Sequence, residues 1–149
     1  MRTYDEKLAP PAGLWVAVWV GAATLGLSVL SALGPWAGLI ALLVPGLLLS
    51  ALLLRSAAVV RVEDGVLRAG RAGIPVALLG PVQVLDAEAA RAVRGPQSDP
   101  AAYHLIRGWV ATGVRAEVRD PQDPTPYWFV ATRRPADLAE AVDRAREGH

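Results

Sequence analysis

The stretch Leu14–Leu33, LWVAVWVGAATLGLSVLSAL, decides the fold of this chain together with a second apolar stretch, Trp36–Leu54. Neither contains a charged residue, and the uncharged run extends from Leu8 through Leu54. Because an α-helix rises about 1.5 Å per residue, each stretch is long enough to cross the roughly 30 Å hydrocarbon core of a bilayer. Backbone polar groups in lipid must be satisfied internally, so the two stretches predict membrane-spanning helices.

Gly34 and Pro35 separate the two stretches. Glycine commonly ends a helix and proline commonly opens the next one, so the prediction is a transmembrane helical hairpin over residues 14–54. A cleaved signal peptide would have a shorter apolar core and would leave the second helix in place. A buried hairpin of a soluble protein would need more surrounding chain, and both arms are long for a re-entrant loop.

Positive charges predict the orientation of the hairpin. Arg2 and Lys7 precede the first helix and Arg55 follows the second, whereas the connecting turn carries no charge. Cytoplasmic flanks of membrane helices are enriched in Lys and Arg, so both termini are expected in the cytoplasm. Residues 1–13 are then a cytoplasmic N-terminal segment, and residues 55–149 form a cytoplasmic domain.

Small residues recur at four-residue spacing on both helices, which lets two backbones approach closely. Two interpretations stay open: the hairpin packs on itself through these residues, or they form the face of a homodimer. Neither span contains an ionisable residue, which argues against a transporter or a channel. The small residues are Gly13, Ala17 and Gly21 on the first helix and Gly46 and Ser50 on the second.

Composition excludes several classes of function. The chain has no cysteine and two histidines, so no metal site is predicted. A net charge of +1 argues against a partner nucleic acid held through its phosphates. No cofactor is expected, because Gly70 and Gly73 match neither nucleotide-binding fingerprint.

The residues after the hairpin have the pattern of an α+β domain. The turn signal Asp64-Gly65 lies between two apolar runs and predicts a β-hairpin. Asp86 is expected to cap a short helix, and an amphipathic helix is expected from about Pro135 to Arg146. The predicted strands are Val59–Glu63, Val66–Arg68, Ile74–Leu79, Val82–Leu85, Tyr103–Ile106, Val114–Val118 and Tyr127–Thr132, with a break at Gly80-Pro81. Seven strands followed by one helix is the order of a pleckstrin-homology-like barrel, which is the fold we expect for this domain.

Several motifs of this sequence resemble those of a known protein family. The most distinctive is Asp123–Trp128, DPTPYW, and another is Asp99–Tyr103. With the two-helix hairpin, these motifs make the sequence similar to an actinobacterial membrane-protein family known as domain of unknown function 3093. The resemblance covers nearly the whole chain and implies a multi-pass protein of a bacterial plasma membrane. It transfers no activity, ligand or catalytic residue. Further matching positions are Tyr4, Glu6 and Leu8, then Arg107, Trp109 and Val110, then Val130, Thr132, Arg133 and Pro135.

An enzyme is not predicted, and no catalytic residue is assigned. His104 is the one internal histidine, and we expect it to be a solvated or hydrogen-bonded residue of a strand. Asp120 and Asp123 each precede a proline, which is typical of turns rather than of paired catalytic carboxylates.

The arginines Arg133 and Arg134, together with Arg107, are the candidate polar site. Guanidinium groups bind phosphate or carboxylate through two parallel hydrogen bonds, and anionic lipid attracts each basic residue by about 1 kcal/mol. The alternative is a solvated helix start with salt bridges to Asp137 or Asp99.

Three aromatic residues, Trp109, Tyr127 and Trp128, are expected chiefly in the core, with a binding platform as the alternative. A small domain depends on its large aromatic side chains for much of its buried apolar area. A platform would instead leave one face of these rings open to a ligand.

The leading hypothesis from the sequence is a non-enzymatic adaptor or scaffold whose cytoplasmic domain binds a partner protein of the membrane or envelope. One alternative is an anionic-lipid-binding module that uses Arg107, Arg133 and Arg134. Another is a structural membrane protein that associates with itself. The expected partners are therefore the lipid bilayer, a membrane or envelope protein and a second copy of the chain.

Overall fold

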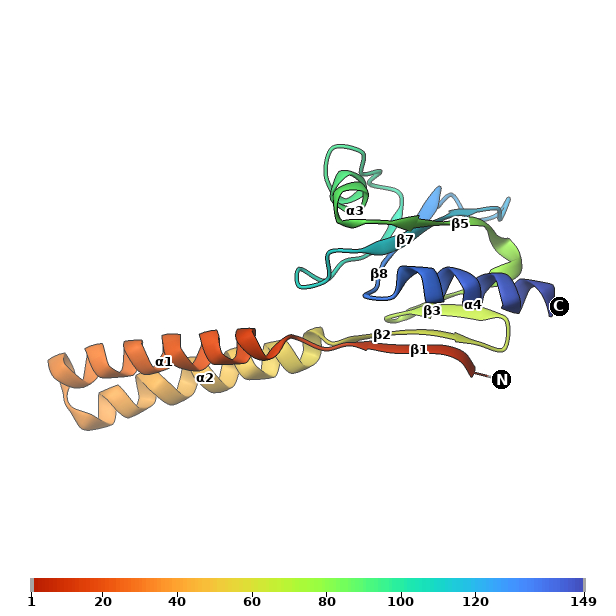
Figure 1. Cartoon of the computed structure of the whole chain (residues 1–149). Helices are drawn as coiled ribbons and strands as arrows, with labels where there is room; N and C mark the ends of the chain where they lie inside the picture. The colour runs from red at the N-terminus through yellow and green to blue at the C-terminus, as the bar shows by residue number, and fades with distance from the viewer. Residues whose placement is uncertain (1, 149) are drawn as a thin grey trace. The chain divides into compact units, whose positions relative to one another are not determined.

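The computed structural model describes the backbone of residues 2–148 and the side chains of residues 4–148. The chain forms two units (Figure 1). The first is helical and comprises Ala9–Ala57. The second combines the strand before the helices with the residues from Ala58 onward.

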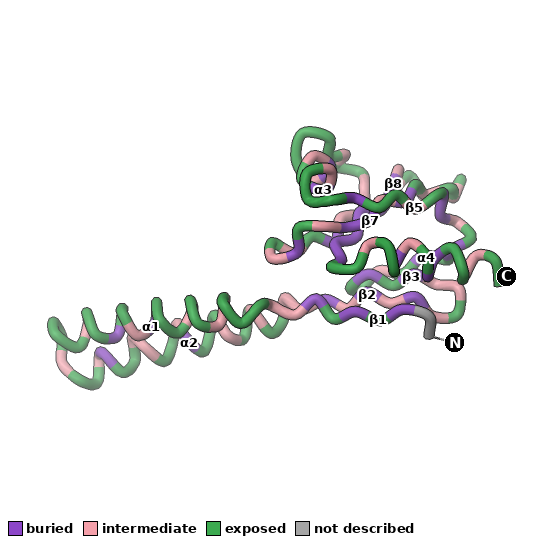
Figure 2. The backbone as a smooth tube through the Cα atoms, in the orientation of Figure 1, coloured by how far each residue is buried: buried purple, intermediate pink, exposed green. Residues whose placement is uncertain are grey.

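The helical unit is the predicted hairpin. It consists of α1 (Ala12–Leu33) and α2 (Pro35–Ser56), each slightly longer than the sequence indicates. Gly34 joins them with a φ of 90°, a conformation that glycine adopts without a Cβ clash. Both helices are long and apolar enough to cross a membrane, and most of their surface is exposed (Figure 2). They are therefore not the buried core helices of a globular domain.

The first sheet of the second unit is antiparallel, in the order β1-β2-β3-β4. Its strands β2 (Ala58–Glu63) and β3 (Val66–Ala69) join through Asp64 and Gly65, both at positive φ, as the turn signal predicts. The strand β4 (Ala72–Pro75) completes one side of the sheet.

The fourth strand of this sheet, β1 (Arg2–Leu8), corrects the sequence analysis, which treated residues 1–13 as a separate segment. Tyr4, Glu6 and Leu8 alternate with exposed residues and point into the core, opposite Val62, Val60 and Ala58 of β2. Period-two burial is the physical reason that this segment forms a strand. The residues before the hairpin therefore belong to the same folded domain as those after it.

The second sheet has the order β5-β7-β8-β6. It contains β5 (Leu79–Leu85), β7 (Gly113–Val118), β8 (Tyr127–Ala131) and β6 (Tyr103–Leu105), the last parallel to β8. All five residues of β8 are buried, so this strand lies at the centre of the core. Its continuous apolar pattern predicts that position.

Two elements between the sheets differ from expectation. The predicted strand Ile74–Leu79 is instead the end of β4 and a short 3₁₀ turn, Val76–Leu78. The predicted break at Gly80-Pro81 is instead a register shift within β5, between Leu79 and Val82. A bulge accommodates a proline that cannot donate to the ladder, so the strand continues past it.

The two predicted helices of the domain are present. The short helix α3 (Ala87–Arg94) begins at Asp86, whose Oδ1 accepts from Ala89 N at 2.8 Å. The C-terminal helix α4 (Pro135–Glu147) buries Leu138, Ala141 and Val142 and contacts strands of both sheets (Figure 1). In the described residues the sheets are open and four-stranded, so the domain is α+β with a C-terminal helix rather than a closed barrel of seven strands.

Candidate functional site

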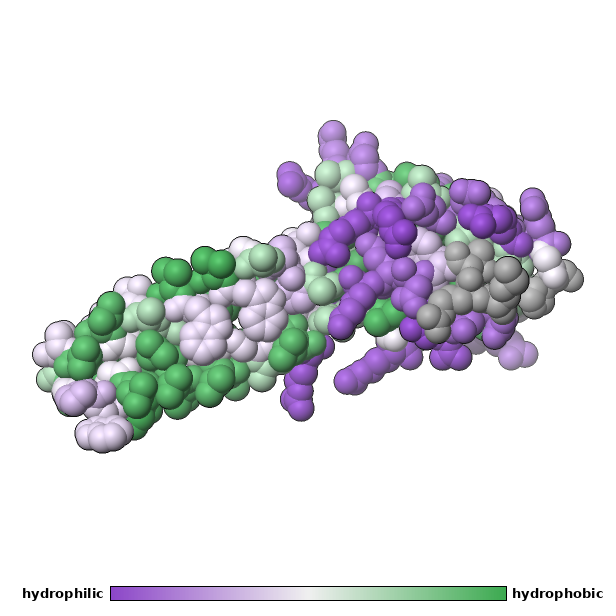
Figure 3. All heavy atoms as spheres, turned by 60° about the horizontal axis from the view of Figure 1, so that its bottom comes forward, coloured by the Kyte–Doolittle hydropathy of each residue, from purple (hydrophilic) through white to green (hydrophobic). Residues whose placement is uncertain are grey.

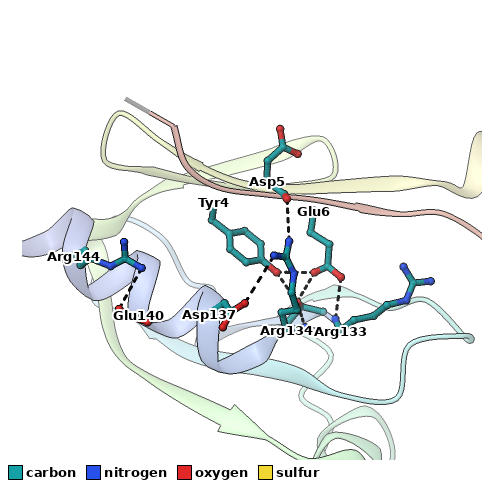
Figure 4. Close-up of polar contacts among 9 residues, drawn as sticks. Tyr4, Asp5, Glu6, Arg133, Arg134, Asp137, Glu140 and Arg144 are labelled. Atoms are coloured by element: carbon teal, nitrogen blue, oxygen red, sulfur yellow. Dashed lines mark hydrogen bonds and ion pairs between the residues drawn. The ribbon is translucent and has the colours of Figure 1, made fainter.

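The start of α4 is bound to β1 through a buried carboxylate (Figure 4). Glu6 Oε2 accepts from the Tyr4 hydroxyl at 2.7 Å and from Thr132 Oγ1 at 2.5 Å, and Glu6 Oε1 accepts from Arg133 N at 3.1 Å. Arg134 N donates to Thr132 Oγ1 at 3.0 Å. Burial, reinforced by the negative charge of Glu6, raises the pKa of Tyr4 to about 12 despite the hydrogen bond with Thr132. This cluster links β1 to the segment between β8 and α4.

The guanidinium of Arg134 belongs to the same contact region. It donates to Asp5 O at 3.1 Å, lies 3.8 Å from Asp137 Oδ2 and stacks 5.0 Å from the Tyr4 ring. The Asp137 contact is one of the two salt bridges expected from the sequence. The Arg133 side chain is exposed and points away from Glu6 (Figure 4). Arg134 is thus engaged within the domain.

Arg107 lies in a different hydrogen-bond network. Its Nη1 donates to Ile106 O at 2.7 Å, and its buried Nε has no partner among the described residues. Its charge lowers the pKa of Tyr103, but burial dominates and raises that pKa overall. Arg107 and Arg134, which the sequence analysis grouped, therefore have different partners.

The aromatic residues lie in the core rather than on a platform. Tyr127 is 4% exposed and Trp128 is 6% exposed, and Trp128 stacks on Tyr103 with ring centroids 4.3 Å apart. Trp109 is half-buried against the same core, and its Nε1 has no partner among the described residues. For Tyr127 and Trp128 the expectation of a core position is confirmed.

The hairpin packs on itself at glycines that the sequence analysis did not select. A Cβ on Gly26 would lie 2.8 Å from Leu42 Cβ, and one on Gly38 would lie 2.7 Å from Leu30 Cβ. The small-residue pair Ala22 and Gly26, also four apart, was the signal that could have identified this contact.

Of the five selected residues, Gly46 faces α1, where its Cβ would meet the Trp19 ring at 2.9 Å. Ser50 is half-buried, and its Oγ has no partner in the described chain. Gly13, Ala17 and Gly21 are exposed, and nothing lies within 4 Å of a Cβ built on either glycine. These three do not pack the hairpin, so a dimer face remains their functional interpretation.

A groove between α3 and the β5–β7 edge of the second sheet is the candidate binding site. It has a volume of about 400 Å³, which falls within the range typical of ligand sites. Its lining combines apolar and polar side chains of β5, β7, α3 and the loop that follows α3. Its lining residues are Gln83, Leu85, Asp86, Glu88, Ala89, Ala92, Val93, Gln97 and Arg115.

Arg115 is the one basic residue among the lining residues of this groove. Its Cζ lies 4.2 Å from the centroid of the Tyr127 ring, a cation–π distance. The Tyr127 hydroxyl accepts from Asp99 N at 3.0 Å, which fixes the loop before β6 against the sheet. The sequence pattern does not indicate this contact, because Arg115 alternates with apolar residues as any solvated strand residue would.

The residues weighed for catalysis have structural roles. His104 Nδ1 lies 3.1 Å from Ala102 O, and Nε2 lies 3.5 Å from Ser98 Oγ. Asp120 and Asp123 accept from backbone N–H groups two residues ahead, as turn formers do. The hydrogen bonds from Thr125 hold the pKa of Asp123 below its ordinary value. In the described part of the chain, no group of three or more His, Cys, Asp or Glu residues could hold a metal ion.

Comparison with known proteins identifies one family whose model matches this chain. The model of the family described as protein of unknown function (DUF3093) matches residues 3–142. Neither a curated protein nor a solved structure matches the chain.

Proposed function

We propose that this chain, which belongs to the family described as protein of unknown function (DUF3093), is a membrane-anchored, non-enzymatic adaptor or scaffold. Its α+β domain binds a partner protein of the membrane or envelope. The observation that carries this proposal is the groove beside α3, whose lining combines apolar side chains with an arginine, two glutamines and two carboxylates. Such a mixture of apolar surface and a few convergent polar groups is typical of a recognition site.

The anchor is supported by the surface of the helical unit. Hydrophobic residues dominate it, whereas hydrophilic residues dominate the other unit (Figure 3). Leu33 and Trp36 are each 75% exposed, and many leucines between them and Leu54 are about half exposed. Burial of apolar area contributes about 25 cal/mol per Å², so a bilayer would stabilise this surface strongly.

The pairing of β1 with β2 supports a single orientation for the flanks of the hairpin. Leu8 lies opposite Ala58 in this antiparallel pair, so the residues before α1 and after α2 lie on the same side of the membrane. Lys7 and Arg55 flank the helices, and by the positive-inside rule that side is the cytoplasm. The same pairing argues against a cleaved signal, because cleavage would remove β1 and its buried side chains Tyr4 and Leu8.

Site-specific photocrosslinking in native membranes tests the adaptor function. A benzophenone amino acid at Gln97, which lines the groove, is expected to capture a discrete partner that mass spectrometry identifies. The matched control is the same probe at Gln122, an exposed glutamine of the loop before β8 that does not line the groove. Identical products from both positions, or only lipid and self-adducts from Gln97, would contradict the adaptor function.

Anionic-lipid binding is a second candidate, supported by Arg133 and Lys7. Both are exposed, and Lys7 lies five positions before the first residue of α1, so chain length keeps it near the bilayer surface. Native mass spectrometry of the full chain from mixed phosphatidylcholine and phosphatidylglycerol tests this candidate. Retention of phosphatidylglycerol that Arg133→Gln abolishes would support it, and equal retention of both lipids would remove it.

A further inference from the structure

One guanidinium group in the groove lacks a hydrogen-bonding partner. Arg115 makes no side-chain hydrogen bond or ion pair with the described part of the chain, and its Nε is buried. Its close contact is the Tyr127 ring, at 4.2 Å. Tyr127 is itself buried and hydrogen-bonded to Asp99 N, so the surface that supports Arg115 is fixed. The donors of Arg115 are thus preorganised without an acceptor.

Two other half-buried arginines show what a purely structural arginine does in this domain. Arg94 donates from Nε, Nη1 and Nη2 to the carbonyl oxygens of Ala90, Val110 and Ala111. Arg146 donates to two carbonyls of β5 and to Asp143. Both arginines satisfy their donors within the fold, whereas Arg115 lines the groove and makes no such hydrogen bond with the described part of the chain.

We propose that Arg115 binds a carboxylate of the partner protein, an Asp or Glu side chain in a short segment that lies in the groove. This inference rests on the proposed adaptor function and names the chemistry of the partner. A guanidinium matches a carboxylate through two parallel hydrogen bonds. The amides of Gln83 and Gln97 line the same groove and can donate to and accept from the backbone of the bound segment.

The acidic residues of the groove decide between a carboxylate and a phosphate. Asp86 and Glu88 line the groove as well, and Asp86 Oδ1 is already the cap of α3. A dianionic phosphate would be repelled by both carboxylates, whereas a single carboxylate carries half of that charge. The groove therefore favours a single carboxylate over a phosphate.

A peptide titration of the full chain tests this inference. The protein is reconstituted in phosphatidylcholine nanodiscs, and the methyl resonances of Leu85 and Val93, which line the groove, are followed by NMR. The probes are acetyl-Ala-Glu-Ala-amide, the uncharged acetyl-Ala-Gln-Ala-amide, and inorganic phosphate. We expect saturable shifts with the glutamate peptide and weaker binding of the other two probes.

The variants assign the binding to Arg115. Arg115→Gln should weaken binding of the glutamate peptide about tenfold, the effect of one lost charge-assisted pair. Arg91→Gln, at an exposed arginine of α3 that does not line the groove, removes the same charge and should bind as the wild type does. Arg115→Lys keeps the charge without the planar fork and should bind with intermediate affinity, which covers the case in which the glutamine variant misfolds.

Three outcomes would overturn the carboxylate site: equal binding of the glutamate and glutamine peptides, wild-type affinity in Arg115→Gln, or tighter binding of phosphate than of the glutamate peptide. Photocrosslinking from Gln97 separates this inference from the adaptor function. Wild-type capture of the partner by Arg115→Gln would overturn the carboxylate site and leave the adaptor function intact. No capture by the wild-type chain would contradict the adaptor function itself.

Discussion

Leu8 and Ala58 lie opposite each other in neighbouring strands, although both long apolar helices separate them in the chain. The strand before the hairpin and the strand after it are thus parts of one sheet. The pairing of β1 with β2 can form only after the second helix has been synthesised. The hairpin is therefore an insertion within the domain, and the first residues of the chain are part of the domain core.

Substitution of Glu6 should destabilise the domain. Glu6 is 8% exposed and accepts from Tyr4, Thr132 and Arg133 N, so Glu6→Ala would leave buried donors without an acceptor. Each such donor costs about 1–3 kcal/mol. We expect the thermal unfolding midpoint of the full chain, followed by tryptophan fluorescence, to fall by several degrees. Lys7→Ala, at the exposed neighbouring position, is the control, and an equal effect of the two changes would contradict this role of Glu6.

The sequence alone predicts the hairpin and much of the domain because those features have local signals. Long uncharged runs, the Asp64-Gly65 turn and the Asp86 cap each depend on residues close together in the chain. The strand β1 has no such signal, since charged residues interrupt its apolar pattern and one of them, Glu6, occupies a buried position. Its burial depends on pairing with β2, across the whole hairpin.

The candidate site was harder to predict for the same reason. The sequence analysis selected Arg134 because two adjacent arginines at a helix start can bind an anion. In the structure Arg134 instead contacts Asp5 and Asp137 of the same domain. The sequence analysis missed Arg115, whose role depends on Tyr127 of the neighbouring strand and on α3 across the groove. A solvated strand arginine and a preorganised one have the same sequence pattern, and only the register distinguishes them.

Alkaline pH should destabilise the domain through Tyr4. Its pKa is about 12 in the folded domain and about 10 in an unfolded chain, so the folded state holds a proton that the unfolded state has released between these values. The stabilisation is complete below pH 10 and is lost as the pH rises toward 12. Chemical unfolding at several pH values should show this loss. In Tyr4→Phe the dependence over this interval should be smaller, and an unchanged slope would contradict the assignment to Tyr4.

The packing of the two helices should depend on Gly26 and tolerate change at Gly21. A Cβ at Gly26 would clash with Leu42, whereas nothing lies within 4 Å of one at Gly21. Spin labels at Ser31 and Ala37, measured by electron–electron resonance in nanodiscs, should report a changed interhelical distance in Gly26→Val. Gly21→Val should leave the distance as in the wild type. A shift in the Gly21 variant alone would show that the helices contact through the other face.

The exposed face of Gly13, Ala17 and Gly21 predicts a separate effect on self-association. If two copies meet there, Gly21→Leu should convert a dimer into a monomer, because the added side chain keeps the backbones apart. Analytical ultracentrifugation in detergent over a range of concentrations measures this. Val44→Leu is the control, since it adds bulk at an exposed position of the other helix. A monomer at every concentration of the wild type would contradict the dimer face.

The membrane orientation can be tested directly because the chain has no cysteine. Single cysteines replace Ser98 in the domain and Leu33 beside the interhelical turn, both of which are exposed. In intact cells a membrane-impermeant maleimide should label Leu33→Cys and not Ser98→Cys, and permeabilisation should make both reactive. Lys7→Cys, at an exposed position of β1, should behave as Ser98→Cys does, because the pairing of β1 with β2 holds both flanks of the hairpin on one side. Labelling of Lys7→Cys but not of Ser98→Cys in intact cells would place the two flanks on opposite sides of the membrane and contradict the pairing of β1 with β2.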